Sequence, residues 1–149
     1  MLETDLFALL EQTADAAYTV TVDGEICSWN GSAERLFGYA AGEVVGRRVD
    51  DVLEARDALG TEALAGGLEA ATRRWGGSEG IADFDLEVRV RSGERRWVNV
   101  STILFDNRRT GRRLFVRLAR DITQRRRTEE LIDRMLDLAR RLVSLSDDA

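Results

Sequence analysis

Strict alternation of apolar and charged residues from Phe84 to Arg91 is the feature that most limits what this chain can fold into. Phe84, Leu86, Val88 and Val90 occupy every second position, and acidic or basic residues fill the positions between them. Because successive side chains of a strand point to opposite faces, this period predicts a strand with one buried face. A polar outer face is typical of antiparallel sheets.

The neighbouring segments supply the other elements of such a sheet. Asp23-Gly24, Ser92-Gly93 and the loop over 106–111 predict turns between strands. The expected strands cover 16–22, 25–29, 84–90, 96–105 and 114–119. The expected helices between the second and third strands cover 30–36, 42–45, 50–53 and 57–74. The predicted fold is therefore α+β, a five-stranded antiparallel sheet with helices on one face, formed by residues 15–122.

Two amphipathic helices are expected to flank this core. Residues 1–14 place leucines, Leu6 and Leu10 among them, at helical spacing. Residues 123–149 carry apolar side chains at spacings of 4-3-4-3, the a/d pattern of a coiled coil, at Leu131, Met135, Leu138, Leu142 and Leu145. An isolated helix of this length is marginal in water, so we expect it to pair with a second copy. The alternative is a helix that folds back onto its own sheet.

Missing residue types exclude several classes of site. The chain contains no histidine, and Cys27 is its only cysteine. Catalytic Ser-His-Asp or Cys-His pairs, histidine-ligated haem, thiolate clusters and intrachain disulfides therefore cannot form. The acidic pair Asp50-Asp51 is expected on a short turn, and Asp83-Asp85 on the solvent side of a strand. Neither position forms the cleft that acid–base catalysis requires. We expect neither an enzyme nor a metal site.

Charge and hydropathy indicate whether the chain binds nucleic acid or membranes. The formal net charge is −5 and the acidic residues are spread along the chain, which disfavours direct nucleic-acid binding. Arg125, Arg126 and Arg127 form a basic cluster that we interpret as a solvated helix face. No apolar run approaches the length of a membrane span, and no secretory pattern is present at the N-terminus. The expected location is cytoplasmic, without membrane contact.

Three local sequences resemble the PAS domain family when taken together at their observed separations. They are Asn30-x-x-Ala33-x-x-Leu36-x-Gly38-Tyr39 with Glu43-Val44-x-Gly46-Arg47, Ser92-Gly93-x-x-Arg96-Trp97-Val98, and Arg120-Asp121-Ile122-Thr123-x-Arg125. The resemblance covers about residues 5–145. Within the family, the chain is similar to sensor domains that precede LuxR-type helix-turn-helix regulators.

This resemblance implies a route by which a signal leaves the domain. Asp121 and Thr123 lie at the junction between the last expected strand and the final helix. Asp121 is expected to accept N–H bonds from the first helical turn, or to pair with an arginine such as Arg47. The implied function is a dimeric sensory input domain that acts on an output domain outside this chain, LuxR-type DNA-binding or kinase. The alternative is a ligand-free dimerisation or protein-interaction module.

The resemblance also implies a ligand pocket between the sheet and the helices. Its expected lining is Trp29, Val49, Leu53, Val88, Val98, Val100, Arg117 and Ala119. Val88, Val98 and Ala119 replace the polar residues that hold flavin in light-sensing LOV relatives, and Val49 replaces their reactive cysteine. We therefore predict no cofactor, neither histidine-ligated haem nor cysteinyl flavin, and a pocket compatible with a small apolar or acidic ligand. Arg117 either grips an acidic ligand or pairs internally with Asp51 or Glu54.

The other face of the sheet is unusually apolar. Alternation places Trp97, Ile103, Val116 and Leu118 on this outer face. Such a surface is not expected to remain in water, so the N-terminal helix, a second subunit, or both should cover it. The expected dimer interface combines these four residues with Leu6, Leu10, Leu131, Met135, Leu138 and Leu142.

Overall fold

A computed structural model of the chain describes residues 3–55 and 82–147. Its centre is a five-stranded antiparallel sheet with strand order β2-β1-β5-β4-β3. The strands are β1 Ala16–Thr21, β2 Ile26–Trp29, β3 Ala82–Arg89, β4 Arg95–Asn107 and β5 Arg112–Asp121. All five predicted strands are confirmed, with ends that differ by at most two residues. The helix expected over 57–74 lies outside the described residues.

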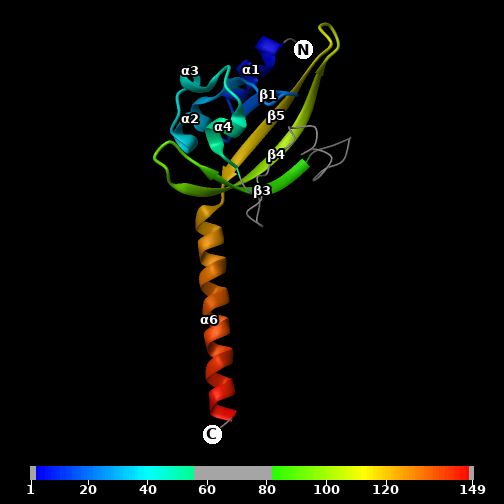
Figure 1. The fold of residues 1–149 in the computed structure, drawn as a ribbon. Coiled ribbons are helices and arrows are strands. Elements are labelled where there is room, and N and C mark those ends of the chain that lie inside the picture. The colour runs from blue at the N-terminus through cyan, green and yellow to red at the C-terminus, as the bar shows by residue number, and fades with distance from the viewer. Residues whose placement is uncertain (1–2, 56–81, 148–149) are drawn as a thin grey trace.

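The short helices that follow β2 gather on one face of this sheet, and a further helix flanks it towards each end of the chain (Figure 1). The helices are α1 Glu3–Glu11, α2 Gly31–Phe37, α3 Ala41–Val44, α4 Val49–Leu53 and α6 Thr123–Asp147. Helix α2 ends at Gly38, whose φ of 83° is the left-handed conformation that glycine adopts freely. A Cβ atom at Gly38 would lie 3.1 Å from Cβ of Arg91, so the turn also needs glycine for space.

An aromatic cluster fills the space between the helices and the sheet. Tyr18, Trp29 and Phe37 are at most 3% exposed. Their ring centroids lie 5.1 to 6.0 Å apart, the distances at which tilted and edge-to-face rings attract. The Trp29 indole N–H donates to the Tyr39 carbonyl at 3.0 Å, so this large ring is buried without an unsatisfied donor.

Asn30 joins three segments through one buried side chain. Its Oδ1 accepts hydrogen bonds from the backbone N–H groups of Ala17 (2.9 Å) and Ala33 (2.8 Å), which caps α2. Its Nδ2 donates to the carbonyl oxygens of Leu10 (2.8 Å) and Asp15 (3.1 Å). The end of α1, the start of β1 and the start of α2 are thereby fixed to one another.

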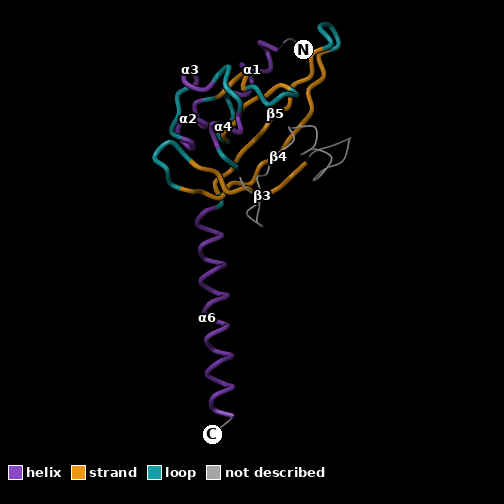
Figure 2. The backbone as a smooth tube through the Cα atoms, in the orientation of Figure 1, coloured by secondary structure: helices purple, strands orange, loops and turns teal. Residues whose placement is uncertain are grey.

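Helix α6 leaves the sheet and stands apart from the other described elements (Figures 1 and 2). From Leu131 to Leu145 its large apolar side chains are 50 to 67% exposed. A helix folded back onto its own sheet would bury these side chains, so the fold-back alternative is not what the chain adopts.

Candidate signal junction and binding core

The junction between β5 and α6 is held to β4 by a compact set of hydrogen bonds. Asp121 Oδ1 accepts the backbone N–H of Thr123 at 2.8 Å, which is the cap arrangement expected from the sequence rather than a pair with Arg47. Thr123 Oγ1 accepts the backbone N–H of Trp97 at 2.9 Å and lies 3.3 Å from the Trp97 carbonyl oxygen. That carbonyl also accepts the N–H of Ile122 at 2.8 Å. The start of α6 is therefore bonded directly to the backbone of β4.

Three arginines follow this junction, and they do not form a simple solvated face. The guanidinium carbon of Arg126 lies 3.9 Å from the centre of the Trp97 ring. The Asp85 carboxylate on β3 lies 3.9 Å from nitrogens of both Arg125 and Arg126. Arg127 lies 3.6 Å from Glu94 in the β3–β4 turn. The sequence interpretation of this cluster was wrong for Arg126.

Asp85 and Arg126 were missed because their proximity depends on strand register and on the direction of α6. Asp85 is paired directly with Asn99 across β3 and β4, and the Asn99 amide donates to it at 3.0 Å. The available sequence signal was that Asp85, Trp97 and Asn99 all alternate onto the outer face. Without the exit angle of the helix, nothing pointed to Arg126 as their partner.

The eight residues expected to line a pocket lie together on the inner face of the sheet. Trp29 comes from β2, Val49 and Leu53 from α4, Val88 from β3, and the remaining four from β4 and β5. Each is at most 3% exposed, and seven belong to one hydrophobic cluster. Whether a ligand enters among them stays a prediction.

Arg117 is the charged member of this group and is 1% exposed. It lies opposite Thr102 across β4 and β5, and among the described residues the buried Thr102 hydroxyl has no hydrogen-bond partner. Of its two expected partners, Glu54 binds Arg89 instead, at 3.1 Å. The charge of Arg117 also acts on the Asp50 carboxylate in α4. Two buried polar side chains, Arg117 and Thr102, therefore lie opposite each other in the sheet.

Burial raises the pKa of the Asp50 carboxyl, and the guanidinium groups of Arg48 and Arg117 only partly oppose this effect. Folding therefore favours the protonated form, and the stability contributed by this group is lost as pH rises through the folded-state pKa. Asp50→Asn, which is neutral at every pH, should be more stable than the original chain at pH 7. This advantage should disappear below the ordinary aspartate pKa of about 4.

Denaturant unfolding at pH 7 and at about pH 3, below the ordinary aspartate pKa, measures this difference, with Asp51→Asn on the exposed neighbour as the control. A less stable Asp50→Asn variant at pH 7 would show that attraction to Arg48 and Arg117 outweighs the loss of hydration.

The outer face of the sheet is covered in part by α1. Arg112 on this face lies 3.4 Å from Glu3 at the start of α1, and Leu6 and Leu10 are half-buried. Val116 is only 5% exposed within a single chain, which leaves little of its side chain for the dimer interface in which it was expected. Intrachain packing already removes Val116 from solvent.

The other three outer-face residues remain accessible to different degrees. Trp97 and Leu118 are half-buried, and Ile103 is 39% exposed. The part of the outer face formed by β4 and the end of β5 is therefore open to solvent within a single chain.

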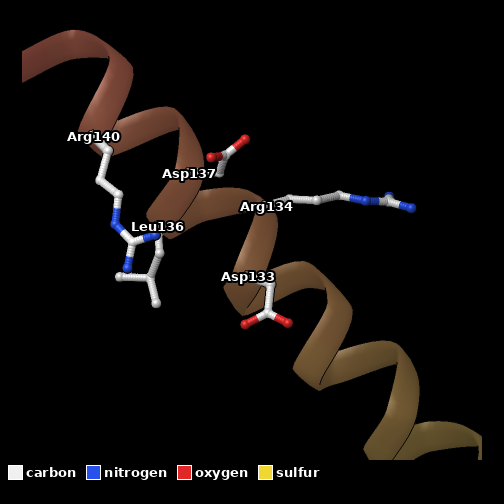
Figure 3. Close-up of a pocket in the computed structure, with 5 residues that line it drawn as sticks. All are labelled: Asp133, Arg134, Leu136, Asp137 and Arg140. Atoms are coloured by element: carbon white, nitrogen blue, oxygen red, sulfur yellow. The ribbon is translucent and has the colours of Figure 1, made fainter. Parts of the chain in front are cut away.

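The surface of α6 contains a shallow hollow among its own side chains (Figure 3). It is lined by Asp133, Arg134, Leu136, Asp137 and Arg140. Figure 3 shows these side chains leaving one helix in different directions, so they enclose no site. An ion pair of 3.2 Å joins Asp137 and Arg141 on the exposed side of the helix, a spacing of i,i+4 at which opposite charges attract.

Comparison with known proteins identifies the family. A family model described as a PAS domain matches residues 15–124, well over half of the chain. The chain belongs to the PAS domain family. No curated protein matches the sequence of this PAS domain.

Solved structures share the PAS fold. The PAS domain of an HTR-like protein from Haloarcula marismortui is 26% identical, with a TM-score of 0.59 over 80% of this chain and 91% of that chain. The PAS domain of Bordetella pertussis BvgS is 22% identical, with a TM-score of 0.58 over 93% and 96%. A sensory box histidine kinase/response regulator from Burkholderia thailandensis is 16% identical, with a TM-score of 0.63 over 94% and 99%.

The described residues also bear on three further features: membrane-spanning helices, metal-binding clusters and the reactivity of the Cys27 thiol. Among residues 3–55 and 82–147, no helix combines the length and apolar character needed to cross a bilayer. In the same ranges no group of three or more histidine, cysteine or acidic residues could hold a metal ion. Burial raises the pKa of the Cys27 thiol, although Arg112 lies 3.2 Å from its sulfur and opposes the shift. This environment disfavours the reactive thiolate.

Proposed function

We propose that this PAS sensory domain works as a parallel dimer, in which a change in the core is passed through the Asp121–Thr123 junction to α6. One observation carries the proposal. Helix α6 is bonded to the sheet at its first residue, while its heptad seam (Leu131, Met135, Leu138, Leu142 and Leu145) is 56 to 67% exposed. A seam of this kind is stable only when a second helix covers it.

Charge favours the parallel arrangement of the two helices. With Leu138 at heptad position d, Arg127, Arg134 and Arg141 occupy every g position from 127 to 141. An antiparallel pair would place these arginine rows against each other, which is repulsive. A parallel pair instead places them beside the uncharged e positions, which are Ile132, Ala139 and Ser146. Parallel helices also bring both C-terminal ends to one output unit.

The route from the core to α6 runs through β4. Val98 faces the buried inner layer, and the adjacent Trp97 bonds Ile122 and Thr123 through its backbone. We expect β4 to adopt two conformations, each coupled to one arrangement of α6. A ligand or partner that binds one conformation more tightly than the other would shift the populations of the two α6 arrangements. The output unit would be a LuxR-type DNA-binding domain or a kinase. The kinase in the name of the Burkholderia thailandensis neighbour fits the second choice.

The ligand itself belongs to the proposal. The apolar lining supports a small apolar ligand, and the buried Arg117 supports an acidic group on it. We propose neither a bound cofactor nor catalysis. The alternative function is a ligand-free dimerisation or protein-interaction module, in which the same residues only stabilise the fold. Native mass spectrometry with an absorption spectrum of the purified protein distinguishes the two: a stoichiometric bound molecule supports the sensor, and none supports the module.

Thr123→Val tests the junction. The change removes the hydroxyl that bonds Trp97 but keeps the shape of the side chain. It should cost about 1–3 kcal/mol, because a part-buried N–H loses its partner. In a fusion of this chain to a dimeric DNA-binding or kinase reporter, we expect the output to change several-fold while the protein remains dimeric.

Thr123→Ser is the matched control, because it keeps the hydroxyl and should keep the output of the original chain. An unchanged output in the valine variant, at full dimer content, would contradict transmission through this junction.

A further inference from the structure

One arginine of the junction differs from its neighbours in burial. The Arg126 side chain is 26% exposed, whereas those of Arg125 and Arg127 are 59 and 67% exposed. Its guanidinium group lies 3.9 Å from the centre of the Trp97 ring, well within the range of a cation–π contact. A planar guanidinium group can stack on such a ring in a way that an ammonium group cannot.

A carboxylate also lies near the same guanidinium group. Asp85 Oδ2 is 3.9 Å from Arg126 Nη1, and Asp85 is itself held by the Asn99 amide at 3.0 Å. Trp97 and Asn99 come from β4, and Asp85 comes from the neighbouring strand β3. The two groups that attract Arg126 are therefore fixed by the sheet and not by α6.

We propose that Arg126 is the positioning residue that sets the direction of α6, through a latch formed by Arg126, Trp97 and Asp85. The hydrogen bonds of Thr123 fix where the helix starts, but a single attachment leaves the helix free to tilt. Arg126 follows Thr123 by three residues on the same side of the helix and supplies a second attachment. Two attachments to one sheet define a direction.

The length of α6 makes this direction important. From Arg126 to Asp147 the helix extends roughly 30 Å, so a tilt of about 10° at its base moves its far end by about 5 Å. A partly exposed cation–π contact with a loose ion pair favours the closed latch on the order of ten-fold over the open one. A preference of this size can be reversed by ligand or partner binding. This inference rests on the proposed role of α6 as the transmitter.

The latch is tested by the distance between the sheet and the helix. Nitroxide labels at Asp23→Cys, in the β1–β2 turn, and Ser144→Cys, on α6, report this distance in a chain that also carries Cys27→Ser. The doubly labelled chain is diluted into unlabelled chain, and double electron–electron resonance gives the distribution within one subunit. Arg126→Gln should broaden this distribution roughly two-fold, as expected for a helix free to tilt over tens of degrees.

The neighbouring arginines are matched controls for the loss of one charge. Arg125→Gln and Arg127→Gln should leave the distribution unchanged, because their contacts are exposed and weak. Arg126→Lys keeps the charge but loses the planar stack, so it should give an intermediate width. Circular dichroism should show the same helix content in every variant. An unchanged width in Arg126→Gln, or equal broadening in Arg125→Gln, would overturn the latch.

The reporter fusion separates the latch from the proposed function. A broadened distribution with unchanged reporter output would support the latch and contradict the role of α6 as transmitter. Altered output with an unchanged distribution would support transmission and overturn the latch.

Discussion

Leu138→Glu is expected to convert the proposed dimer into a monomer. Leu138 lies in the middle of the heptad seam and is 58% exposed within one chain. In a parallel dimer the substitution would bury two like charges against each other, which costs several kcal/mol. The dissociation constant should therefore rise by about 10²-fold or more. Sedimentation or light scattering over a range of concentrations measures the change.

Ser144→Glu is the control for this experiment. It introduces the same side chain on the same helix, but at a polar position outside the seam. The dimer should persist in this variant. A Leu138→Glu variant that remains dimeric would show that the outer face of the sheet, and not α6, holds the subunits together. An original chain that is monomeric at every concentration would contradict the dimeric sensor itself.

Asn30→Ala is expected to be the most destabilising of the polar substitutions considered. The change removes the cap of α2 and leaves four backbone groups without their partner, on Ala17, Ala33, Leu10 and Asp15. Loss of a cap costs about 0.5–2 kcal/mol, and a buried polar group left unsatisfied costs about 1–3 kcal/mol. A total loss of roughly 3–5 kcal/mol is a large part of the stability of a small domain. Denaturant unfolding measures it.

Asn107→Ala provides the comparison. Asn107 is also buried, at 7% exposure, but within the described part of the chain its side chain accepts one hydrogen bond, from the backbone N–H of Arg109. Its removal should cost only about 1 kcal/mol. Equal losses in the two variants would mean that the joint at Asn30 contributes no more than a single hydrogen bond.

Local residue patterns in the sequence were sufficient to predict β3, α6 and the buried face of β5. The alternation after Phe84 identified β3, because the two faces of a strand differ at successive residues whatever surrounds them. The 4-3 spacing from Leu131 predicted the apolar seam of α6, because residues three and four positions apart lie on the same face of a helix. Alternation also placed Arg117 on the buried face, where it lies at 1% exposure.

Contacts between distant segments could not be obtained in this way. Arg126 looked like part of a solvated cluster, because its neighbours in sequence are arginines and glutamates. Its contact with Trp97 exists because the Thr123 bonds place the start of α6 beside β4, within reach of that ring. Val116 looked available to a second subunit, but packing within its own chain leaves it only 5% exposed.

The amino-acid sequence by itself determined the order of the strands and helices, their inner and outer faces and the seam of α6. These properties depend on spacing along the chain, which a sequence states directly. Only the tertiary structure decided that Arg126 and Asp85 lie close together at the base of α6, that the charge of Arg117 acts on Asp50, and how much of the sheet α1 covers. Those contacts depend on angles between elements, and small differences in packing set these angles without leaving a periodic trace.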